Sequence, residues 1–336
     1  MIALLDRNTY EMFHCHTDYS LLDSCTKYED YVRLAVDNGQ KTLSISEHGK
    51  PLNWTEKWNA CKNAGLKYIH SVEIYLTEEL EPKVRDNYHT VLMAKNYEGV
   101  LELNKLVEVS CRKDHTYYVN RISFEEFLNI SDNIISTSAC LASPLNKLPE
   151  NHPMYMKLAR KYDFFEIQPH NIRDQIEFNK KLLKLSNEIG TPLIAGTDTH
   201  SSSKYKAECR AMLLEAKNKS YVDEDALDLS YKTYDELVDM FKIQNAIPEE
   251  EYLKAIANTL LLDEMTEEIE LDTSIKYPIL YGSREADSNK FTELVYKKLD
   301  EKLENGIIPE EQEVAFRNEI EEEFRVFRKL KMDGLT

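Results

Sequence analysis

Short β-rich runs alternate with helical runs as far as about residue 216, and this alternation limits the possible folds more than any other feature of the sequence. Repeated β-then-α order predicts parallel strands with helices packed outside them. Seven runs favour a closed α/β barrel, in which functional residues lie at the carboxyl ends of strands. The predicted strands are Met12–His16, Thr42–Ser46, Lys67–Leu76, His89–Ala94, Asn133–Ser138, Phe164–Gln168 and Pro192–Ala195.

The composition changes after about Ser220, where acidic helical segments replace the β-then-α pattern. We therefore predict a barrel domain over residues 1–219 and a helical acidic extension over residues 220–336. The last predicted helix begins at Pro309 and carries an apolar stripe from Phe316 to Leu330. A stripe of this kind needs a partner surface.

The chain carries 42 basic and 60 acidic side chains, for a formal charge of −18. This balance argues against a general nucleic-acid binder with a basic face. No apolar run approaches the ~18 residues of a membrane span, so no membrane partner is expected. Six scattered cysteines without a CxxC pair predict reduced thiols and a cytoplasmic protein.

Metal-binding side chains occur at or near the ends of nearly every predicted strand. His14 and His16 are two residues apart on a strand and share a face, and Asp198 and His200 repeat this spacing. The other candidates are Asp23, His48, Glu73, His89 and Cys140. Taken singly, Asp23 reads equally as a solvated loop acid and Cys140 as a core residue. Together the nine predict a metal centre, and their donor atoms suit Zn²⁺, with Mn²⁺ or Fe²⁺ as alternatives.

Two other histidines also border the predicted strands. His70 precedes Glu73 by three residues, so on a straight strand it faces the opposite side. His170 follows the sixth strand and is a candidate for contact with substrate, with a place beside the cleft as the alternative.

These residues resemble the PHP (polymerase and histidinol phosphatase) superfamily, above all the PHP domain that opens the α subunit of bacterial-type DNA polymerase III. A looser likeness continues through Tyr231–Leu237 and the last helix to Gly334, so the resemblance covers nearly the whole chain. The specific matches are Phe13–Asp23, Glu47–Gly49, Cys61–Lys67, Val72–Tyr75, His89–Asn96, Ser138–Leu141 and Thr197–His200.

The resemblance implies a (β/α)7 PHP-type barrel followed by a mainly helical extension, and a cluster of three divalent metal ions. All nine family positions are filled, which favours an active site over a structural remnant. The family usually has Asp where this chain has Glu47, a residue expected to support His48 rather than bind metal. By motif, the three metals take His14, His16, Glu73 and Asp198; Glu73, His89 and Cys140; and Asp23, His48 and His200.

The resemblance further implies phosphoester hydrolysis, in which the metals activate water and stabilise the leaving alkoxide. A polymerase context indicates a DNA 3′ end as substrate, and hence 3′→5′ exonuclease proofreading in a bacterial cell or phage-infected host. The expected partners are the remainder of a DNA polymerase, a nucleotidyltransferase, or other replication proteins. No acidic pair on a β-hairpin follows Ser220. We therefore expect the chain to end before the polymerase palm and not to polymerise DNA alone.

Two other interpretations remain open at this point. The first is a stand-alone phosphatase resembling histidinol phosphatase, which shares the metal ligands and differs in its substrate. The second is a metal-bound structural scaffold within a split polymerase. If metal removal lowers the melting temperature and does not reduce catalysis, the scaffold is favoured.

Overall fold

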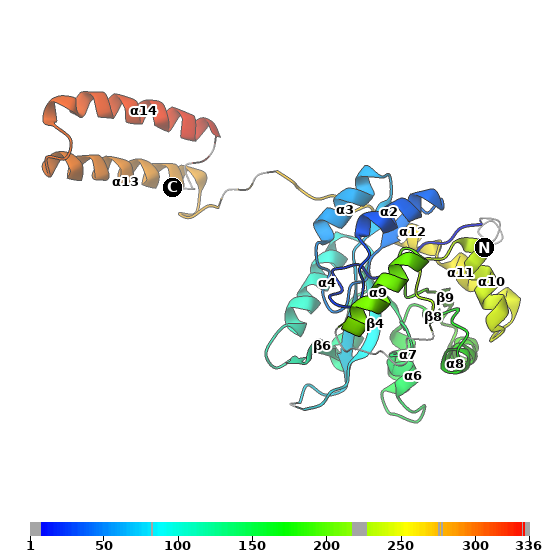
Figure 1. The fold of residues 1–336 in the computed structure, drawn as a ribbon. Coiled ribbons are helices and arrows are strands. Elements are labelled where there is room, and N and C mark those ends of the chain that lie inside the picture. The colour runs from blue at the N-terminus through cyan, green and yellow to red at the C-terminus, as the bar shows by residue number, and fades with distance from the viewer. Residues whose placement is uncertain are drawn as a thin grey trace. The chain divides into compact units, whose positions relative to one another are not determined.

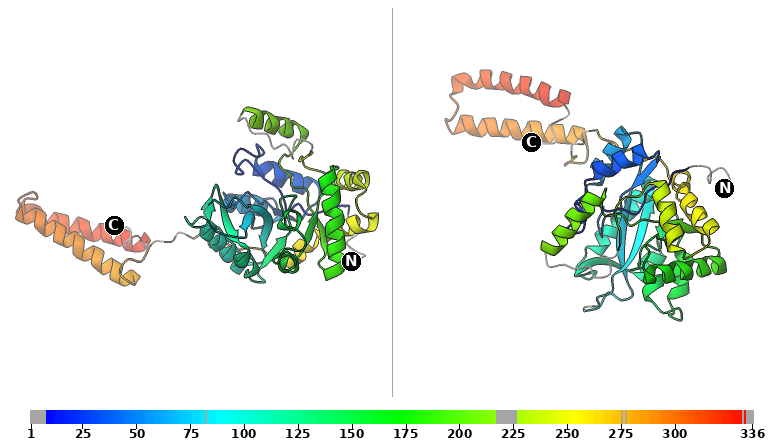
Figure 2. Two further views of the ribbon diagram at one scale, coloured as in Figure 1. Left: turned by 90° about the horizontal axis from the view of Figure 1, so that it is seen from below. Right: turned by 45° about the vertical axis from the view of Figure 1, so that its right-hand side comes forward.

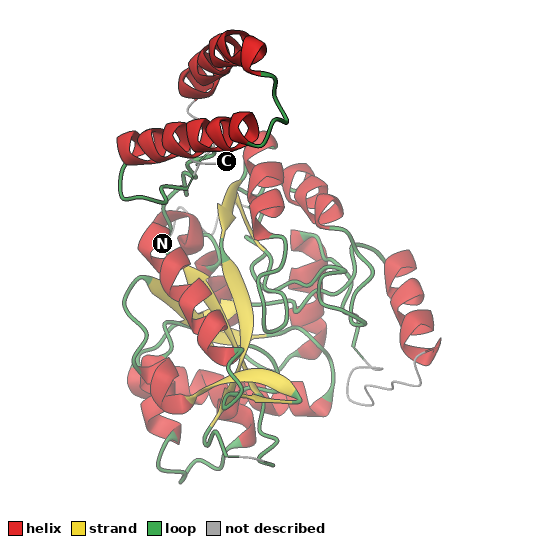
Figure 3. Cartoon of the chain, turned by 90° about the vertical axis from the view of Figure 1, so that its left-hand side faces the viewer, coloured by secondary structure: helices red, strands yellow, loops and turns green. Residues whose placement is uncertain are grey.

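The computed structural model describes residues 8–81, 83–216, 227–274, 276, 278–330 and 332. The chain forms two compact units, Met1–Glu270 and Leu271–Thr336. The first unit contains all the strands among the described residues, and the second is helical (Figure 1, Figure 3). No helix in the described parts of the chain has the length and apolar character needed to cross a membrane.

The strands of the first unit form three sheets. The first pairs β1 (Thr42–Ser44) with β2 (Lys67–Ile69), and the third pairs β8 (Phe165–Ile167) with β9 (Leu193–Ala195), both in parallel. The middle sheet has the order β5-β6-β3-β4-β7. Its strands are β3 (Ser71–Thr77), β4 (Tyr88–Ala94), β5 (Thr116–Tyr117), β6 (Val119–Ser123) and β7 (Ile134–Thr137).

The prediction of parallel strands throughout is wrong at β4, which runs antiparallel to both β3 and β7. The described residues of the connection between β3 and β4 contain no helix, and a parallel return would need a crossover of a dozen or more residues. The predicted first strand, Met12–His16, is an extended segment whose backbone joins Ser44 and Ser46 on one side and Thr199 on the other. The fold is therefore mixed α/β, while the seven-stranded (β/α)7 barrel stays a prediction.

Helices lie around these strands (Figure 2). The helical runs expected between the strands are confirmed, among them those over residues 28–37, 97–110 and 173–189. The elements are α2 (Tyr28–Asp37), α3 (Trp54–Asn63), α4 (Tyr97–Ser110), α5 (Phe124–Leu128), α6 (Pro144–Lys147), α7 (Tyr155–Lys161), α8 (Arg173–Ile189) and α9 (Lys204–Ala216). One buried apolar cluster spans the three sheets and includes Phe13, Ile69, Val91, Ile135, Phe164 and Ile194.

The two compact units divide the chain at a different place from the predicted domain boundary. That boundary, between residues 219 and 220, lies outside the described residues. The helices α10 (Tyr234–Gln244), α11 (Glu249–Asn258) and α12 (Leu261–Met265) belong to the first unit, because α11 packs on β9 and Leu262 joins the apolar cluster.

The second unit is a helical hairpin of α13 (Arg284–Glu304) and α14 (Glu313–Leu330), joined through the short 3-10 helix η1 (Glu310–Gln312). The predicted stripe on the last helix finds part of its partner here, because Phe324 and Phe327 pack against Phe291. Phe316 and Leu330 stay exposed. Of the C-terminal motif residues, 331, 333 and 334 lie outside the described residues.

Candidate metal centre

The nine predicted site residues lie together in the first unit, brought there by segments that are far apart in the sequence. His14 and His16 lie on the first extended segment, Asp23 in the loop after it, and His48 four residues beyond β1. The remaining five come from β3, β4 and the turns after β7 and β9: Glu73, His89, Cys140, Asp198 and His200. Asp198 has a φ of 45°, a left-handed conformation that is costly for a non-glycine residue and frequent at functional sites.

Glu73 lies at the middle of this group and is fully buried. Its Oε1 lies 2.8 Å from His89 Nδ1 and 3.4 Å from His14 Nε2, and its Oε2 lies 2.6 Å from His48 Nδ1. Cys140 Sγ lies 3.9 Å from the same Oε1. An acid inside an apolar strand is costly unless it is paired or bound to metal. Here five other candidates surround it, since His16 Nε2 also lies 3.6 Å from Oε2.

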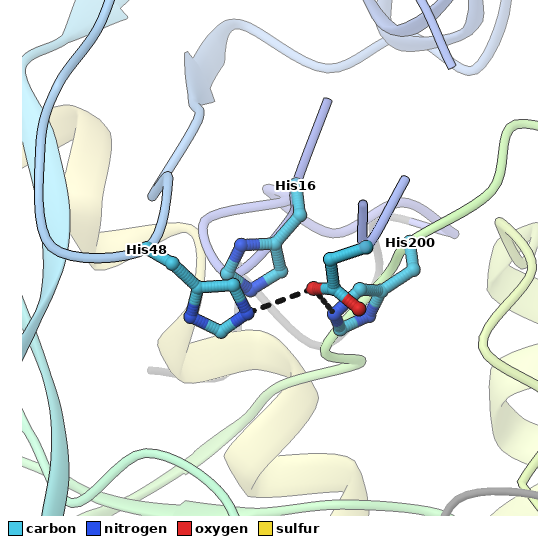
Figure 4. A group of neighbouring side chains, drawn as sticks. His16, His48 and His200 are labelled. Atoms are coloured by element: carbon cyan, nitrogen blue, oxygen red, sulfur yellow. Dashed lines mark hydrogen bonds and ion pairs between the residues drawn. The ribbon is translucent and has the colours of Figure 1, made fainter. Parts of the chain in front are cut away.

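Asp23 organises the other side of the centre. Its Oδ2 lies 2.8 Å from Nε2 of both His48 and His200, and its Oδ1 accepts from Arg210 of α9 at 2.6 Å. The imidazole ring of His16 stacks between the other two, with centroids 4.2 Å from His48 and 4.4 Å from His200 (Figure 4). Four side chains with potential metal-ligand atoms thus lie close together, each from a different segment: His16, Asp23, His48 and His200.

Five buried donor or acceptor atoms of the centre have no hydrogen-bond partner among the described residues, although they lie against one another. Asp198 Oδ1 is 3.2 Å from Nε2 of both His14 and His16, and His48 Nδ1 is close to Glu73 Oε2. Contacts at these distances without hydrogen-bond geometry are expected of ligands arranged around a cation. The five atoms are His14 Nε2, His16 Nε2, His48 Nδ1, Glu73 Oε2 and Asp198 Oδ1.

The charges of the centre shift the pKa values of its members in opposite directions. Burial lowers the pKa of His14, but the carboxylates of Glu166 and Asp198 outweigh it and hold that pKa well above its ordinary value. Burial and the neighbouring His48 and His200 lower the pKa of His16 to about 4. Protons on some rings therefore offset the buried carboxylates, and divalent cations would replace those protons.

Residues 13–187 match the family model of the PHP domain. The chain belongs to the PHP domain family. The first compact unit contains this PHP domain, and the nine side chains include three groups of His, Asp and Glu whose donor atoms lie within 4.8 Å of one another.

Curated relatives of the chain are DNA polymerase III α subunits. The one from Borreliella burgdorferi is 27% identical over 286 residues, which cover 79% of this chain and 24% of the relative. The one from Helicobacter pylori is 27% identical over 372 residues, which cover 98% of this chain and 30% of the relative. The chain thus spans 24% and 30% of the length of these two relatives.

Solved structures resemble the chain at lower sequence identity than these relatives. Endonuclease Q in complex with a 27-mer duplex carrying an abasic lesion aligns with a TM-score of 0.40 at 15% identity, over 59% of this chain and 50% of that one. A two-domain protein from Bacteroides vulgatus, described as containing a predicted PHP-like metal-dependent phosphoesterase, aligns with a TM-score of 0.40 at 12% identity, over 66% and 62% of the two chains.

Glu166 was not among the predicted residues of this PHP domain. It is fully buried on β8, and its Oε1 lies 2.6 Å from His14 Nδ1. The other oxygen accepts from Thr137, and Gln168 donates to Oε1 at 2.9 Å. An acid inside the apolar run Phe164–Ile167 is the same signal that singled out Glu73.

Glu47 lies behind the PHP centre rather than in it, as predicted from the resemblance. Its carboxylate pairs with the buried Lys57 at 2.5 Å and accepts from Ser20 at 2.5 Å. Ser20 Oγ in turn accepts from the backbone N–H of His48 at 3.2 Å and lies 3.3 Å from His16 Nδ1. Ser20 therefore connects Glu47 with two of the nine residues, His16 and His48.

His70 and His170 both lie outside the nine-residue group. His70 packs against Trp54 and lies 3.0 Å from Asn104, away from Glu73, which agrees with its predicted position on the opposite face. His170 is buried, and burial lowers its pKa to about 4. Its expected contact with substrate stays a prediction.

Proposed function

We propose that the nine side chains bind divalent metal ions and that this PHP domain hydrolyses phosphodiester bonds at DNA 3′ ends, as a 3′→5′ exonuclease. The observation that supports this best is the set of five buried, mutually facing ligand atoms without hydrogen-bond partners among the described residues. Buried polar groups are nearly always satisfied, so five such atoms facing one another fit a site that binds cations.

The assignment of ligands follows the motif positions, with zinc favoured and manganese or iron as alternatives. It agrees with the grouping of Asp23, His48 and His200, which also includes His16, and with the grouping of His14, His16 and Glu73. The proposed number of metals is three. The third takes His89 and Cys140 with the shared Glu73, from which they lie 2.8 and 3.9 Å.

Neighbouring residues of the chain would fix the proton position on His14 and the orientation of Asp23. Glu166 accepts the Nδ1 proton of His14, so the lone pair on Nε2 faces Glu73 and Asp198. Arg210 holds Asp23 with its Oδ2 toward His48 and His200. Bound metals would supply an activated water and stabilise the leaving alkoxide.

We place this activity within a DNA polymerase III α subunit of a bacterial cell or phage-infected host, acting with the remainder of the polymerase or other replication proteins. The likeness to a portion of such subunits supports this context. We also propose that the seven strand segments form a closed barrel. Supporting this, single parallel bridges link Cys15 with Thr199, His48 with Glu73, and Thr137 with Phe164.

The test is digestion of 5′-labelled single-stranded DNA and of duplex DNA with a mismatched 3′ end, in the presence of Zn²⁺ or Mn²⁺. We expect stepwise shortening from the 3′ end and about three metals per chain by elemental analysis. Asp198→Asn removes a ligand without changing its size and should reduce the rate by more than about a hundredfold.

The matched control is Asp163→Asn. The Asp163 carboxylate accepts hydrogen bonds from the backbone N–H and the hydroxyl of Ser136, which is not one of the nine residues, so this variant should keep its activity. The proposal fails if no divalent metal supports cleavage, or if Asp198→Asn cleaves as fast as the unaltered chain. Cleavage of phosphomonoesters alone would indicate a phosphatase like histidinol phosphatase instead.

A further inference from the structure

A small pocket opens beside the metal centre. Its volume is ≈ 150 Å³, and its lining includes His89, Cys140, Leu141, Lys147, Gln175 and Asp198. A cavity of about this volume accommodates benzene in other proteins, so one five- or six-membered ring fits. Because three of the lining residues belong to the proposed centre, a ring in this pocket would lie next to the reacting phosphate.

Gln175, one of the lining residues of this pocket, carries a buried acceptor without a hydrogen-bond partner among the described residues. The residue lies in the first turn of α8 and is 1% exposed. Its Nε2 donates to Asn179 Oδ1 at 2.9 Å, while its buried Oε1 has no hydrogen-bond partner among the described residues.

The surrounding network fixes which end of the Gln175 amide is the acceptor. Asn179 Nδ2 donates to the backbone carbonyl of Gln168 at 2.8 Å, and the Gln168 N–H donates to Asn179 Oδ1. The side chain of Asn179 therefore cannot turn over, and its Oδ1 must face Gln175. Gln175 must therefore direct its NH2 group at Asn179 Oδ1, which leaves its own Oε1 without a hydrogen-bond partner among the described residues.

A buried carbonyl oxygen without a donor is destabilising, so the pocket is suited to a molecule that brings an O–H or N–H group. The terminal deoxyribose of a DNA strand carries one donor that does not depend on the base, its 3′-hydroxyl. The phosphates are ionised at neutral pH and offer none. An enzyme that removes any of the four nucleotides can rely only on that hydroxyl.

We propose that this pocket receives the 3′-terminal deoxyribose and that Gln175 Oε1 accepts a hydrogen bond from its 3′-hydroxyl, which makes Gln175 a specificity-determining residue. This inference rests on the proposed function, because it takes the phosphate on the 5′ side of that sugar to lie at the metal centre. Lys147 is exposed and contributes a cation to the same pocket.

The experiment compares two otherwise identical 5′-labelled oligonucleotides, one ending in a 3′-hydroxyl and one in a 2′,3′-dideoxynucleotide. The unaltered chain should remove the hydroxyl-terminated nucleotide with a kcat/KM about tenfold higher. Gln175→Met has nearly the same size and no acceptor oxygen, so it should treat both ends alike. Lys147→Met, the control at the same pocket, should slow both reactions equally and keep the preference.

A binding measurement separates this inference from the proposed function. Calorimetry with the metal-loaded protein should show deoxyadenosine 5′-monophosphate binding about tenfold more tightly than its 2′,3′-dideoxy analogue, and Gln175→Met should abolish the difference. This holds whether or not DNA is cleaved. The inference is overturned if the unaltered chain cleaves the two ends with the same kcat/KM. That result would leave water as the only occupant of the pocket. A preference that follows the base or persists in Gln175→Met also overturns the inference.

Discussion

Glu166 determines which nitrogen of His14 faces the candidate metal centre. A carboxylate 2.6 Å from Nδ1 holds the proton on that nitrogen and directs Nε2 toward Glu73 and Asp198. The same carboxylate is held by Thr137 and Gln168, so its own position is fixed. A residue that touches no metal thereby sets the geometry of one that is proposed to bind it.

Glu166→Gln is therefore expected to weaken metal affinity about 10-fold to 100-fold, because a neutral amide makes His14 a poorer ligand. Competition with a chromophoric chelator measures this affinity without any enzymatic assay. Glu11→Gln is the matched control, because Glu11 is also buried and, among the described residues, its carboxylate accepts hydrogen bonds from Lys41 and Thr42 only. Equal metal affinity in the two variants would refute the role of Glu166.

His70 predicts a pH dependence of stability. Burial lowers its pKa to about 4, against about 6.5 in an unfolded chain. As the pH falls below about 6.5, the unfolded chain takes up a proton that the folded chain does not accept until about pH 4. The free energy of unfolding should therefore fall across this window, by ~3 kcal/mol for this residue.

Urea unfolding of the metal-free protein between pH 7 and pH 4.5 measures this loss. His70→Gln removes the titrating ring, and its amide can still reach Asn104, so the variant should lose less stability on acidification than the unaltered chain. The same pH slope in both proteins would show that His70 is not responsible.

At the scale of elements, the end of β9 and the middle of β8 meet at one glycine. A Cβ on Gly196, the residue after β9, would overlap the carboxylate of Glu166. Gly190, the C-cap of α8, has a φ of 84° and open space around its Cα. One glycine is required by close packing and the other by its backbone conformation.

Alanine at each position separates these two requirements. Gly196→Ala should displace Glu166 and reduce both thermal stability and metal affinity. Gly190→Ala should cost about 1 kcal/mol of stability and leave metal affinity unchanged. Chelator competition and thermal melting of the two variants make the comparison. Unchanged metal binding in Gly196→Ala would contradict this account.

The elements also show how far the sequence alone could lead. The helices that begin at residues 28, 97 and 173 could be predicted from local periodicity. The spacing of two residues on extended segments likewise predicted four members of the candidate site: His14, His16, Asp198 and His200. The direction of β4 could not be predicted, because a strand's composition is the same in either direction and only the helix-free connection before it indicates a reversal. Glu166 lies in an apolar run, as Glu73 does, but only the fold brings its carboxylate beside His14.

At the scale of the whole chain, two compact units have different sources of stability. The first contains the candidate metal centre and the apolar cluster, and the second is a hairpin held by ring contacts among Phe291, Phe324 and Phe327. Metal removal leaves Glu73, Asp23 and Asp198 as buried carboxylates without cations. Their mutual repulsion and desolvation act within the first unit only.

A chelator should therefore lower the melting temperature of the first unit and leave that of the hairpin unchanged. Saturation at a hundred times the dissociation constant corresponds to ~2.7 kcal/mol. Scanning calorimetry with and without metal resolves the two transitions. Phe324→Ala is the converse variant, expected to destabilise the hairpin by ~3 kcal/mol at unchanged metal content. A melting profile insensitive to chelator would argue against bound metal.

The three groups of candidate ligands overlap pairwise. His16 belongs to the first and second groups, His48 to the first and third, and Glu73 to the second and third. No group can therefore lose one of these residues alone, since each such loss leaves a second group incomplete. Metal loading of such a centre is expected to be cooperative, with partly filled states scarce at intermediate metal concentrations.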